Sequence, residues 1–365
     1  MNETKKTCLY ERHVALGAQM SPFAGFEMPI QYEGIAEEHR AVRTACGVFD
    51  VSHMGEVAVS GPGATEFVNY IFTNDVSAMQ TGQVLYGMML NDNGGTVDDL
   101  LVYRRDADSY LLVINAANID KDVAWITAHA AGRDVEVDDL SDELAELAVQ
   151  GPDSEQMLKE VLGINAADLT FYNFKEELLD GAHILVSRTG YTGEDGFEIY
   201  APAEAITGLW DALIESGRVK PCGLGCRDTL RFEVGLPLYG NELADDISPV
   251  EASLSMFAKL DKPQFIGRDT VARQKAEGPK RRIVGLEVLD RAIPRHGYEV
   301  LTPDGRTIGH ITTGYRGISV DKSIAMAMVD ADCAATGTQL EVQIRRKRFP
   351  AVVTSRKFYK KSYKK

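Results

Sequence analysis

The sequence predicts an α+β fold: two related α+β subdomains with antiparallel sheets, followed by a C-terminal β-barrel. Three observations predict it, namely an internal repeat, hairpin patterns in both copies of the repeat, and a final region that contains short strands only. The chain has 365 residues, of which 44% are hydrophobic and 25% charged, enough for a sizeable core spread over two or three domains.

The internal repeat is marked by two Gly-Pro pairs, Gly61-Pro62 and Gly151-Pro152, ninety positions apart. A β-rich run precedes each pair, and apolar residues at helical spacing follow it. Strand-turn-helix units are common, so coincidence could produce this much. The apolar helix faces also match at the same offset, which favours two related subdomains. The matching residues are Phe67, Val68, Ile71 and Phe72 in the first copy and Met157, Leu158, Val161 and Leu162 in the second.

Hairpin patterns follow both Gly-Pro units. In the first copy, β-rich runs flank the turn N-D-N-G-G and a further run follows; in the second, two runs flank T-G-Y-T-G-E-D. Helices are predicted to start near Ala116, Ala203 and Gly225. The predicted strands are residues 84–90, 96–103 and 110–115 in the first copy and 182–188 and 196–201 in the second.

A change of pattern near residue 278 predicts a domain boundary. A polar helix over Val271–Gly278 leads into a linker, and beyond it short strands alternate with Gly, Pro and Asp turns, which is typical of a small barrel. We therefore assign residues 1–278 to the two interleaved subdomains and residues 279–365 to the barrel with a basic tail. The predicted barrel strands are residues 283–288, 298–301, 308–312, 323–329, 340–344 and 351–354.

The formal charge of −15 argues against nucleic acid as a partner. No apolar run has the length of a membrane span, and the N-terminus lacks the apolar core of a signal peptide, so we expect a cytoplasmic protein. The charge is uneven, because the tail from Arg345 to Lys365 holds ten Lys or Arg and no acidic residue, which leaves −25 on the rest. This tail is either a solvated terminus or a docking element for an anionic ligand or acidic protein.

Five scattered cysteines are typical of reduced thiols. Cys222 and Cys226 lack the C-x-x-C spacing, and no His or second Cys pair lies nearby, so we expect packing residues and no metal site. Asp50, Ser52 and His53 do not predict a catalytic triad, because neighbouring residues on an extended segment face opposite ways. We expect His53 to be a structural histidine.

Two adjacent carboxylates, Asp98 and Asp99, head an otherwise apolar strand. A charge carried into apolar surroundings is costly unless it is paired or used. Because side chains alternate along a strand, Asp98 shares a face with Leu100, whereas Asp99 shares a face with Leu101 and Tyr103. The two carboxylates therefore cannot act as a facing pair. The pattern leaves open which of them faces a cavity.

Five ordered motifs cover nearly the whole chain: F-D-V-S-H-M (49–54), G-G-T-V-D-D-L-L-V-Y (94–103), G-Y-T-G-E-D-G-F-E-I (190–199), C-G-L-G-C-R-D-T-L-R-F-E-V-G-L-P-L-Y-G (222–240) and F-I-G-R (265–268). They closely resemble the T-proteins of the glycine cleavage system, a family of tetrahydrofolate-dependent aminomethyltransferases. The K-G-C-Y-x-G-Q-E hallmark of the related iron–sulfur maturation proteins is missing. The resemblance implies three lobes around a central folate channel and tetrahydrofolate as co-substrate, with no metal. It also implies an acidic partner, the lipoylated H-protein, which carries the aminomethyl group.

The resemblance assigns catalysis to Asp99, as a fixed charge or a proton relay. We assign Asp98 to a structural hydrogen bond. The resemblance places Glu198 on the pterin 2-amino and ring N–H groups, with a cross-strand ion pair, for instance to Arg188, as the alternative. The alternative for Arg227 is an intrahelical ion pair, but Asp228 faces elsewhere and Arg231 repels it, so Arg227 is free for an anionic or carbonyl oxygen of the ligand. The resemblance also implies folate contacts by Met54, Tyr86, Asn115, Tyr191 and Tyr363. Plain core packing is the alternative for the first four, and Tyr363 lies in the basic tail.

Two other functions stay open at this point. A folate-dependent demethylase of the same superfamily would share the folate site and differ at the second substrate. A folate-binding scaffold without turnover belongs to another class. For the basic tail, the candidate partners are the acidic H-protein and the polyglutamate chain of cellular folates.

Overall fold

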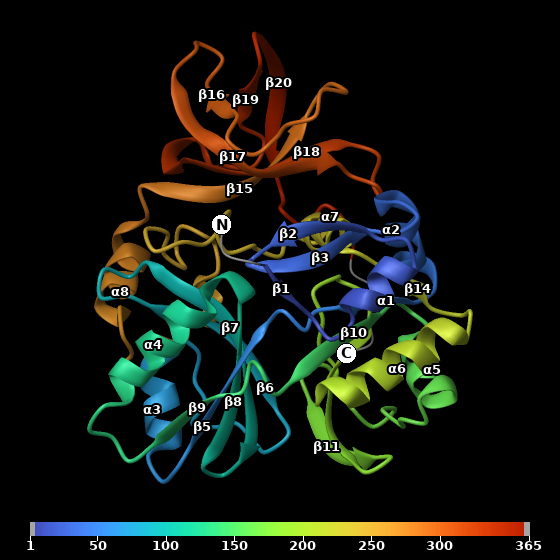
Figure 1. Cartoon of the computed structure of the whole chain (residues 1–365). Helices are drawn as coiled ribbons and strands as arrows, with labels where there is room; N and C mark the ends of the chain where they lie inside the picture. Colours follow the sequence, from blue (N-terminus) through green and yellow to red (C-terminus); the bar gives the residue numbers. More distant parts are fainter. Residues whose placement is uncertain (1–3, 361–365) are drawn as a thin grey trace.

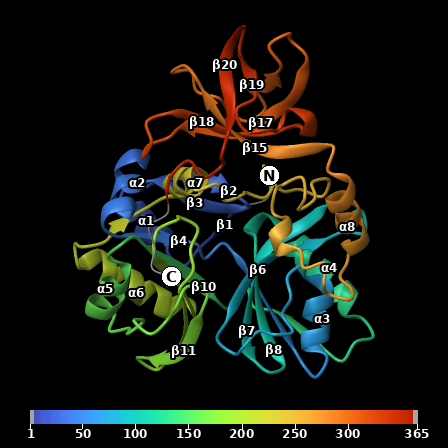
Figure 2. The ribbon, with the colours of Figure 1, turned by 180° about the vertical axis from the view of Figure 1, so that it is seen from behind.

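The computed structural model describes residues 4–360 and arranges them in three lobes (Figure 1). The C-terminal barrel lies at the top of the view, and two lobes that each combine a sheet with helices lie below it. The view from behind shows the same arrangement (Figure 2). This confirms the predicted fold class, whereas the central folate channel stays a prediction. Among the described helices, none is long and apolar enough to cross a membrane.

The first of the lower lobes contains a five-stranded sheet in the order β6-β7-β8-β5-β9. All neighbouring strands are antiparallel, as the hairpin patterns predict. Gly94 has a φ of +80° in the turn between β6 and β7, a conformation that explains why the turn uses glycine. The strands are β5 (Gly55–Ser60), β6 (Val84–Leu90), β7 (Thr96–Asp106), β8 (Ser109–Ile114) and β9 (Glu136–Asp139).

The second lower lobe contains a six-stranded sheet in the order β11-β12-β13-β10-β4-β14. Its first four strands repeat the order β6-β7-β8-β5 of the first sheet, and β10 lies ninety residues after β5, so the structure confirms the repeat. The strands are β4 (Gly47–Asp50), β10 (Ala145–Gln150), β11 (Phe174–Leu179), β12 (Ala182–Ser187), β13 (Gly196–Ala201) and β14 (Lys220–Pro221).

The two sheets exchange one strand each. β4 precedes β5 in the chain but pairs with β10 of the second sheet, and β9 precedes β10 but pairs with β5 of the first. The two pairings are equivalent: Asp50 opposes Leu147, and Asp139 opposes Val57. Each sheet is therefore completed by a strand from the other half of the repeat, which ties the two subdomains into one unit.

Helices cover one side of each sheet. The predicted apolar helix faces are buried, for example Phe67 and Val68 against the first sheet and Met157 and Leu158 against the second. The covering helices are α3 (Ala64–Ile71) and α4 (Ile119–Ala130), preceded by the 3-10 turn η1 (Ala116–Asn118), on the first sheet, and α5 (Ser154–Val161) and α6 (Ala203–Glu215) on the second.

The other sides of the two sheets pack against each other. Within this contact the hydroxyls of Tyr103 and Tyr200, one from each sheet, are hydrogen-bonded at 3.0 Å. We call this contact the intersheet cluster; it contains Val84, Tyr103, Leu111, Val113, Phe174, Leu185 and Tyr200.

The remaining elements connect the lobes. A small N-terminal sheet has the order β1-β3-β2, and α2 packs against α7, whose start near Gly225 the sequence predicts. The elements are β1 (Lys5–Lys6), α1 (Tyr10–Ala15), β2 (Gln19–Phe23), β3 (Phe26–Gln31), α2 (Ile35–Thr44), α7 (Leu224–Glu233), η2 (Ser255–Phe257) and α8 (Arg268–Glu277).

The C-terminal lobe is a closed six-stranded barrel in the order β15-β18-β17-β16-β19-β20, which confirms the predicted barrel. Helix α8 ends at Glu277 and β15 begins at Arg281, so the domain boundary that we predict at residue 278 falls between them. The elements are β15 (Arg281–Val288), β16 (Glu299–Leu301), β17 (Thr307–Arg316), β18 (Ser323–Asp330), η3 (Ala331–Cys333), β19 (Gln339–Ile344) and β20 (Lys347–Thr354).

Candidate active site

The adjacent carboxylates on β7 point to opposite sides of the first sheet. Leu100, on the face of Asp98, lies in the core beneath α3 and α4. On the face of Asp99, Tyr103 belongs to the intersheet cluster and Leu101 packs against it. Strand alternation therefore places Asp98 beneath the helices and turns Asp99 toward the second sheet.

Tyr86 and Asn115 hold the half-buried Asp99 side chain. The hydroxyl of Tyr86 donates to Oδ2 at 2.9 Å, and the side-chain amide of Asn115 donates to Oδ1 at 3.0 Å. The ring of Tyr86 in turn packs edge-on against Phe257, with ring centroids 4.9 Å apart. Because each carboxylate oxygen faces a fixed donor, the orientation of Asp99 is set by the protein itself.

Asp98 is fully buried, and N–H donors surround its carboxylate. Oδ1 accepts hydrogen bonds from the side-chain amides of Asn115 at 2.8 Å and Asn118 at 2.7 Å, and Oδ2 accepts one from the backbone N–H of Asn115 at 2.9 Å. These bonds confirm the structural role predicted for Asp98. They also fix Asn115, so Asp98 orients a donor of Asp99.

Burial, with a smaller contribution from the charge of Asp98, raises the pKa of Asp99 to about 7. The hydrogen bonds from Tyr86 and Asn115 act in the opposite direction, because they stabilise the ionised form. A carboxyl group that titrates near neutrality can both accept and release a proton at physiological pH.

Glu198 and Arg227 lie on the second sheet and on α7. Oε2 of Glu198 accepts a hydrogen bond from the hydroxyl of Thr189 at 2.5 Å, and Oε1 lies 4.0 Å from Nη2 of Arg227. Burial raises the pKa of Glu198. Nη1 of Arg227 is buried and has no hydrogen-bond partner within residues 4–360. A buried donor without an acceptor is costly, so this arrangement fits a site that a ligand completes.

Aromatic rings lie next to Arg227: its guanidinium carbon is 5.2 Å from the ring centroid of Tyr191 and 5.9 Å from that of Phe49. The hydroxyl of Tyr191 donates to the carbonyl of Pro237. Burial raises the pKa of this hydroxyl, and the nearby charge of Asp99 acts in the same direction. Met54 contacts both the intersheet cluster and the core between α2 and α7. Tyr363 lies outside the described residues.

Two family models match the chain. The GCVT N-terminal domain matches residues 9–262, and the glycine cleavage T-protein C-terminal barrel domain matches residues 281–360. The chain belongs to the glycine cleavage T-protein family. The resemblance seen in the five sequence motifs is thereby confirmed.

Individual T-protein relatives match over the full length. A protein named aminomethyltransferase from Caldanaerobacter subterraneus subsp. tengcongensis is 50% identical over 369 residues, covering 100% of this chain and 98% of the relative. One of the same name from Alkaliphilus oremlandii is 49% identical and is covered completely. The crystal structure of the glycine cleavage system aminomethyltransferase T from Bartonella henselae superposes with a TM-score of 0.95 at 35% identity, covering 99% of both chains.

Contacts elsewhere in this T-protein family member settle two alternatives from the sequence. Arg188 pairs with Asp195 at 2.5 Å and Glu155 at 2.9 Å, and no ion pair between Arg188 and Glu198 occurs among the described residues. Asp50 binds Nε2 of His13 at 2.8 Å, which rules out a triad with His53. Burial lowers the pKa of His53 to about 4, as a neutral structural histidine requires.

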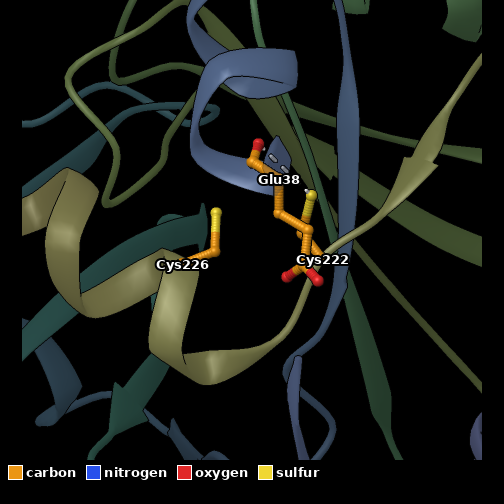
Figure 3. A group of neighbouring side chains, drawn as sticks. All are labelled: Glu38, Cys222 and Cys226. Carbon is orange, nitrogen blue, oxygen red and sulfur yellow. Dashed lines mark hydrogen bonds between the residues drawn. The ribbon is translucent and has the colours of Figure 1, made fainter. Parts of the chain in front are cut away.

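Glu38, from α2, lies beside Cys222 and Cys226 at the start of α7 (Figure 3). All three are buried, and Cys222 donates weakly to the backbone carbonyl of Glu38. The Glu38 carboxylate already accepts hydrogen bonds from backbone N–H groups, at 2.6 Å from Tyr32 and 2.9 Å from Gly223. Burial also raises the pKa of the Cys222 thiol. These contacts favour a structural junction between α2 and α7 over a metal centre, and the expected lack of a metal stays a prediction.

The sequence patterns do not predict three residues near the site, namely Phe257, Asn118 and Asp122. Phe257 is the last residue of the 3-10 turn η2, and no local pattern in the sequence predicts that this turn packs against Tyr86. Asn118 and Asp122 are four residues apart, so they share one face of the turn that opens α4. Two polar residues on the inward face of a helix are the signal that could have pointed to them.

Replacing Asp99 by Asn should make the stability less dependent on pH. The pKa of Asp99 is higher in the folded chain than its value of 3.8 in the unfolded chain, so its contribution to stability is full below about pH 4 and is lost as the pH rises through about 7. At pH 8 the Asp99→Asn variant should therefore gain about 1–3 kcal/mol of unfolding free energy over the wild type.

Chemical denaturation at pH 5 and pH 8 measures this effect. The exposed Asp92, in the turn that precedes β7, provides the control variant Asp92→Asn. A difference between wild type and Asp99→Asn that is the same at both pH values would contradict the raised pKa.

Proposed function

We propose that the chain is the tetrahydrofolate-dependent aminomethyltransferase of glycine cleavage. It releases ammonia from the aminomethyl group on the lipoyl arm of H-protein and transfers the methylene carbon to tetrahydrofolate. The products are 5,10-methylenetetrahydrofolate and dihydrolipoyl H-protein. Membership of the T-protein family and the names of the full-length relatives support this activity.

The observation that carries the mechanism is the setting of Asp99. Its carboxylate is half-buried, held by donors from Tyr86 and Asn115, and turned toward the second sheet that carries Glu198. Loss of ammonia leaves positive charge on the transferred carbon. A fixed anion stabilises that charge far better in a site shielded from water than in bulk solvent.

The reaction needs no external acid or base. Two N–H protons leave the folate nitrogens as they bond to the carbon, and the departing ammonia and the lipoyl sulfur each take up one. Asp99 can accept the first of these protons and release it again, because its pKa of about 7 suits both steps at neutral pH. Asn115 and Tyr86 keep the accepting oxygens in place.

The pair of the buried Glu198 and the partly buried Arg227 suits the pterin end of the folate. A carboxylate can accept two parallel hydrogen bonds from an amino group and a ring N–H. Oε1 of Glu198 is open to such a contact, since Arg227 stands 4.0 Å away, and Nη1 of Arg227 offers its unused donor to a ring oxygen. Tyr191 and Met54, next to this pair, supply flat and apolar surfaces for the ring system.

The partners follow from the same assignment. The basic tail favours an acidic partner, the H-protein, or the polyglutamate chain of folate. Five free cysteines are consistent with a reducing compartment, and a cytoplasmic location stays a prediction. A demethylase would accept a methyl compound in place of the loaded carrier, and a scaffold would bind folate without turnover, so assays with H-protein separate the three functions.

Removing the charge of Asp99 should abolish most turnover. We expect Asp99→Asn to lower kcat by about a hundredfold or more while folate affinity stays near the wild-type value, because the charge acts on the reacting carbon and not on the pterin. Steady-state formation of methylenetetrahydrofolate and a folate-binding titration measure the two effects. Asp92→Asn is the control for loss of a carboxylate, and wild-type turnover in a folded Asp99→Asn enzyme would refute the assignment.

Changes at the pterin end should act on binding instead. Glu198→Gln and Arg227→Lys should each weaken folate binding about tenfold or more, since each removes a charge-assisted or bidentate contact, with kcat at saturation much less affected. Isothermal titration with tetrahydrofolate measures the affinity. The exposed Arg218 gives the matched control Arg218→Lys; unchanged affinity in both site variants would move the pterin elsewhere.

Salt should weaken the interaction with the carrier. If the basic tail contributes to binding the acidic H-protein, the KM for loaded H-protein should rise severalfold between about 0.05 and 0.3 M salt. Lys357→Glu, at an exposed tail position, should raise this KM more than Lys275→Glu on α8. A KM that is insensitive to salt for both H-protein and polyglutamylated folate would argue against both tail partners.

A further inference from the structure

Asp122 on α4 is a fully buried acid for which the proposed mechanism has no use. The nearest cation, Lys121, lies 3.7 Å away at Nζ but donates to the backbone carbonyl of Val97 at 2.5 Å and to the hydroxyl of Tyr239 at 3.0 Å. If Asp122 is treated as ionised, neither of its oxygens has a hydrogen-bond donor among the described residues. An ionised carboxylate in that position would be costly.

One helical turn before Asp122, Asn118 donates to Oδ1 of Asp98, and the raised pKa of Asp122 indicates that its carboxyl group also lies within hydrogen-bonding reach of Asp98. Two carboxylate oxygens both accept hydrogen bonds, so they can be partners only when one of them carries a proton. Asp98 accepts three N–H bonds, which favour its ionised form, whereas Asp122 receives none. The proton therefore belongs on Asp122, and burial next to Asp98 raises the pKa of Asp122 to about 10, in agreement with the contacts.

We propose that Asp122 is a positioning residue: as a neutral acid it donates its O–H to Asp98 and thereby keeps Asp98 ionised and aligned behind Asp99. The inference rests on the proposed function for its kinetic consequences. A carboxylate offers about four acceptor positions, and the Asp122 O–H adds a fourth donor to the three N–H bonds. With Asp98 saturated in this way, its charge and the orientation of Asn115 are both fixed.

The charge of Asp98 reaches the reaction through Asp99. The titratable groups that face Asp99 are Tyr86 on β6, Tyr191 from the loop before β13, and Asp98 on its own strand. Asp98 in turn faces Asp122, Lys121 and Tyr239. Because Asp98 helps to raise the pKa of Asp99, any loss of its charge should lower that pKa and move the pH profile of turnover.

Two variants of Asp122 separate a neutral donor from an ionised acid. Asn at position 122 retains an N–H that can donate to Asp98, whereas Leu retains the volume and has no donor. The acid limb of kcat against pH should stay at the wild-type position in Asp122→Asn. In Asp122→Leu it should move to lower pH by about half a unit or more, because Asp98 then loses a donor that stabilises its charge beside Asp99.

Every other outcome overturns the proposal. Equal shifts in both variants would mean that Asp122 is ionised in the wild type, since both remove a charge. No shift in either variant would make Asp122 a purely structural residue. The conservative variant also shows whether an effect of Asp122→Leu reflects lost folding, because Asp122→Asn preserves the shape and the donor.

A second measurement does not depend on the proposed reaction or on a variant's activity. In wild-type protein labelled with ¹³C at aspartate carboxyls, the resonance that disappears in Asp122→Asn should have the chemical shift of a protonated carboxyl at pH 7. An ionised shift at pH 7 would overturn the proposal. If this resonance is protonated but the chain transfers no aminomethyl group, the proposed function fails while the assignment of the proton stands.

Discussion

The exchange of β4 and β9 between the two sheets is the constraint on which the rest of the structure depends. Each sheet needs a strand from the opposite half of the repeat, so neither subdomain is complete alone. The exchange leaves the helix-free sides of the sheets to pack against each other through the intersheet cluster. Strand alternation then decides which side chains enter that contact, and Asp99 and Glu198, the acids in our proposed mechanism, are among those on this side.

Asp98 and Asp99 differ in their burial and in their hydrogen-bond donors, and this difference explains why an apolar strand carries two carboxylates. Asp98 is deeply buried, and three N–H donors offset the cost of its charge. Burial, with a smaller contribution from the charge of Asp98, raises the pKa of Asp99 to about 7, because only two donors, from Tyr86 and Asn115, act in the opposite direction. The first carboxylate is thus a fixed element of the scaffold, and the second is a group that can change its protonation state during a reaction.

The sequence predicts the architecture well because local patterns determine it. The Gly-Pro pairs, the apolar helix faces and the turn at Gly94 all act over short distances, and the strand order follows from consecutive hairpins. The same patterns do not reveal the strand exchange, since β4 pairs with a strand about a hundred residues away and β9 with one about eighty residues away. The candidate site shows the same limit: Asn115 and Tyr86 came from family resemblance, whereas Phe257 and Asp122 reach the site through tertiary packing alone.

We propose that this T-protein family member uses Asp99 to couple ammonia release to folate. The most direct test is ammonia release from aminomethyl-loaded H-protein, with and without tetrahydrofolate, measured together with methylenetetrahydrofolate. We expect release that depends on folate, with one methylene product for each ammonia. Folate binding without release from the loaded carrier would contradict it and would point to a demethylase or a scaffold.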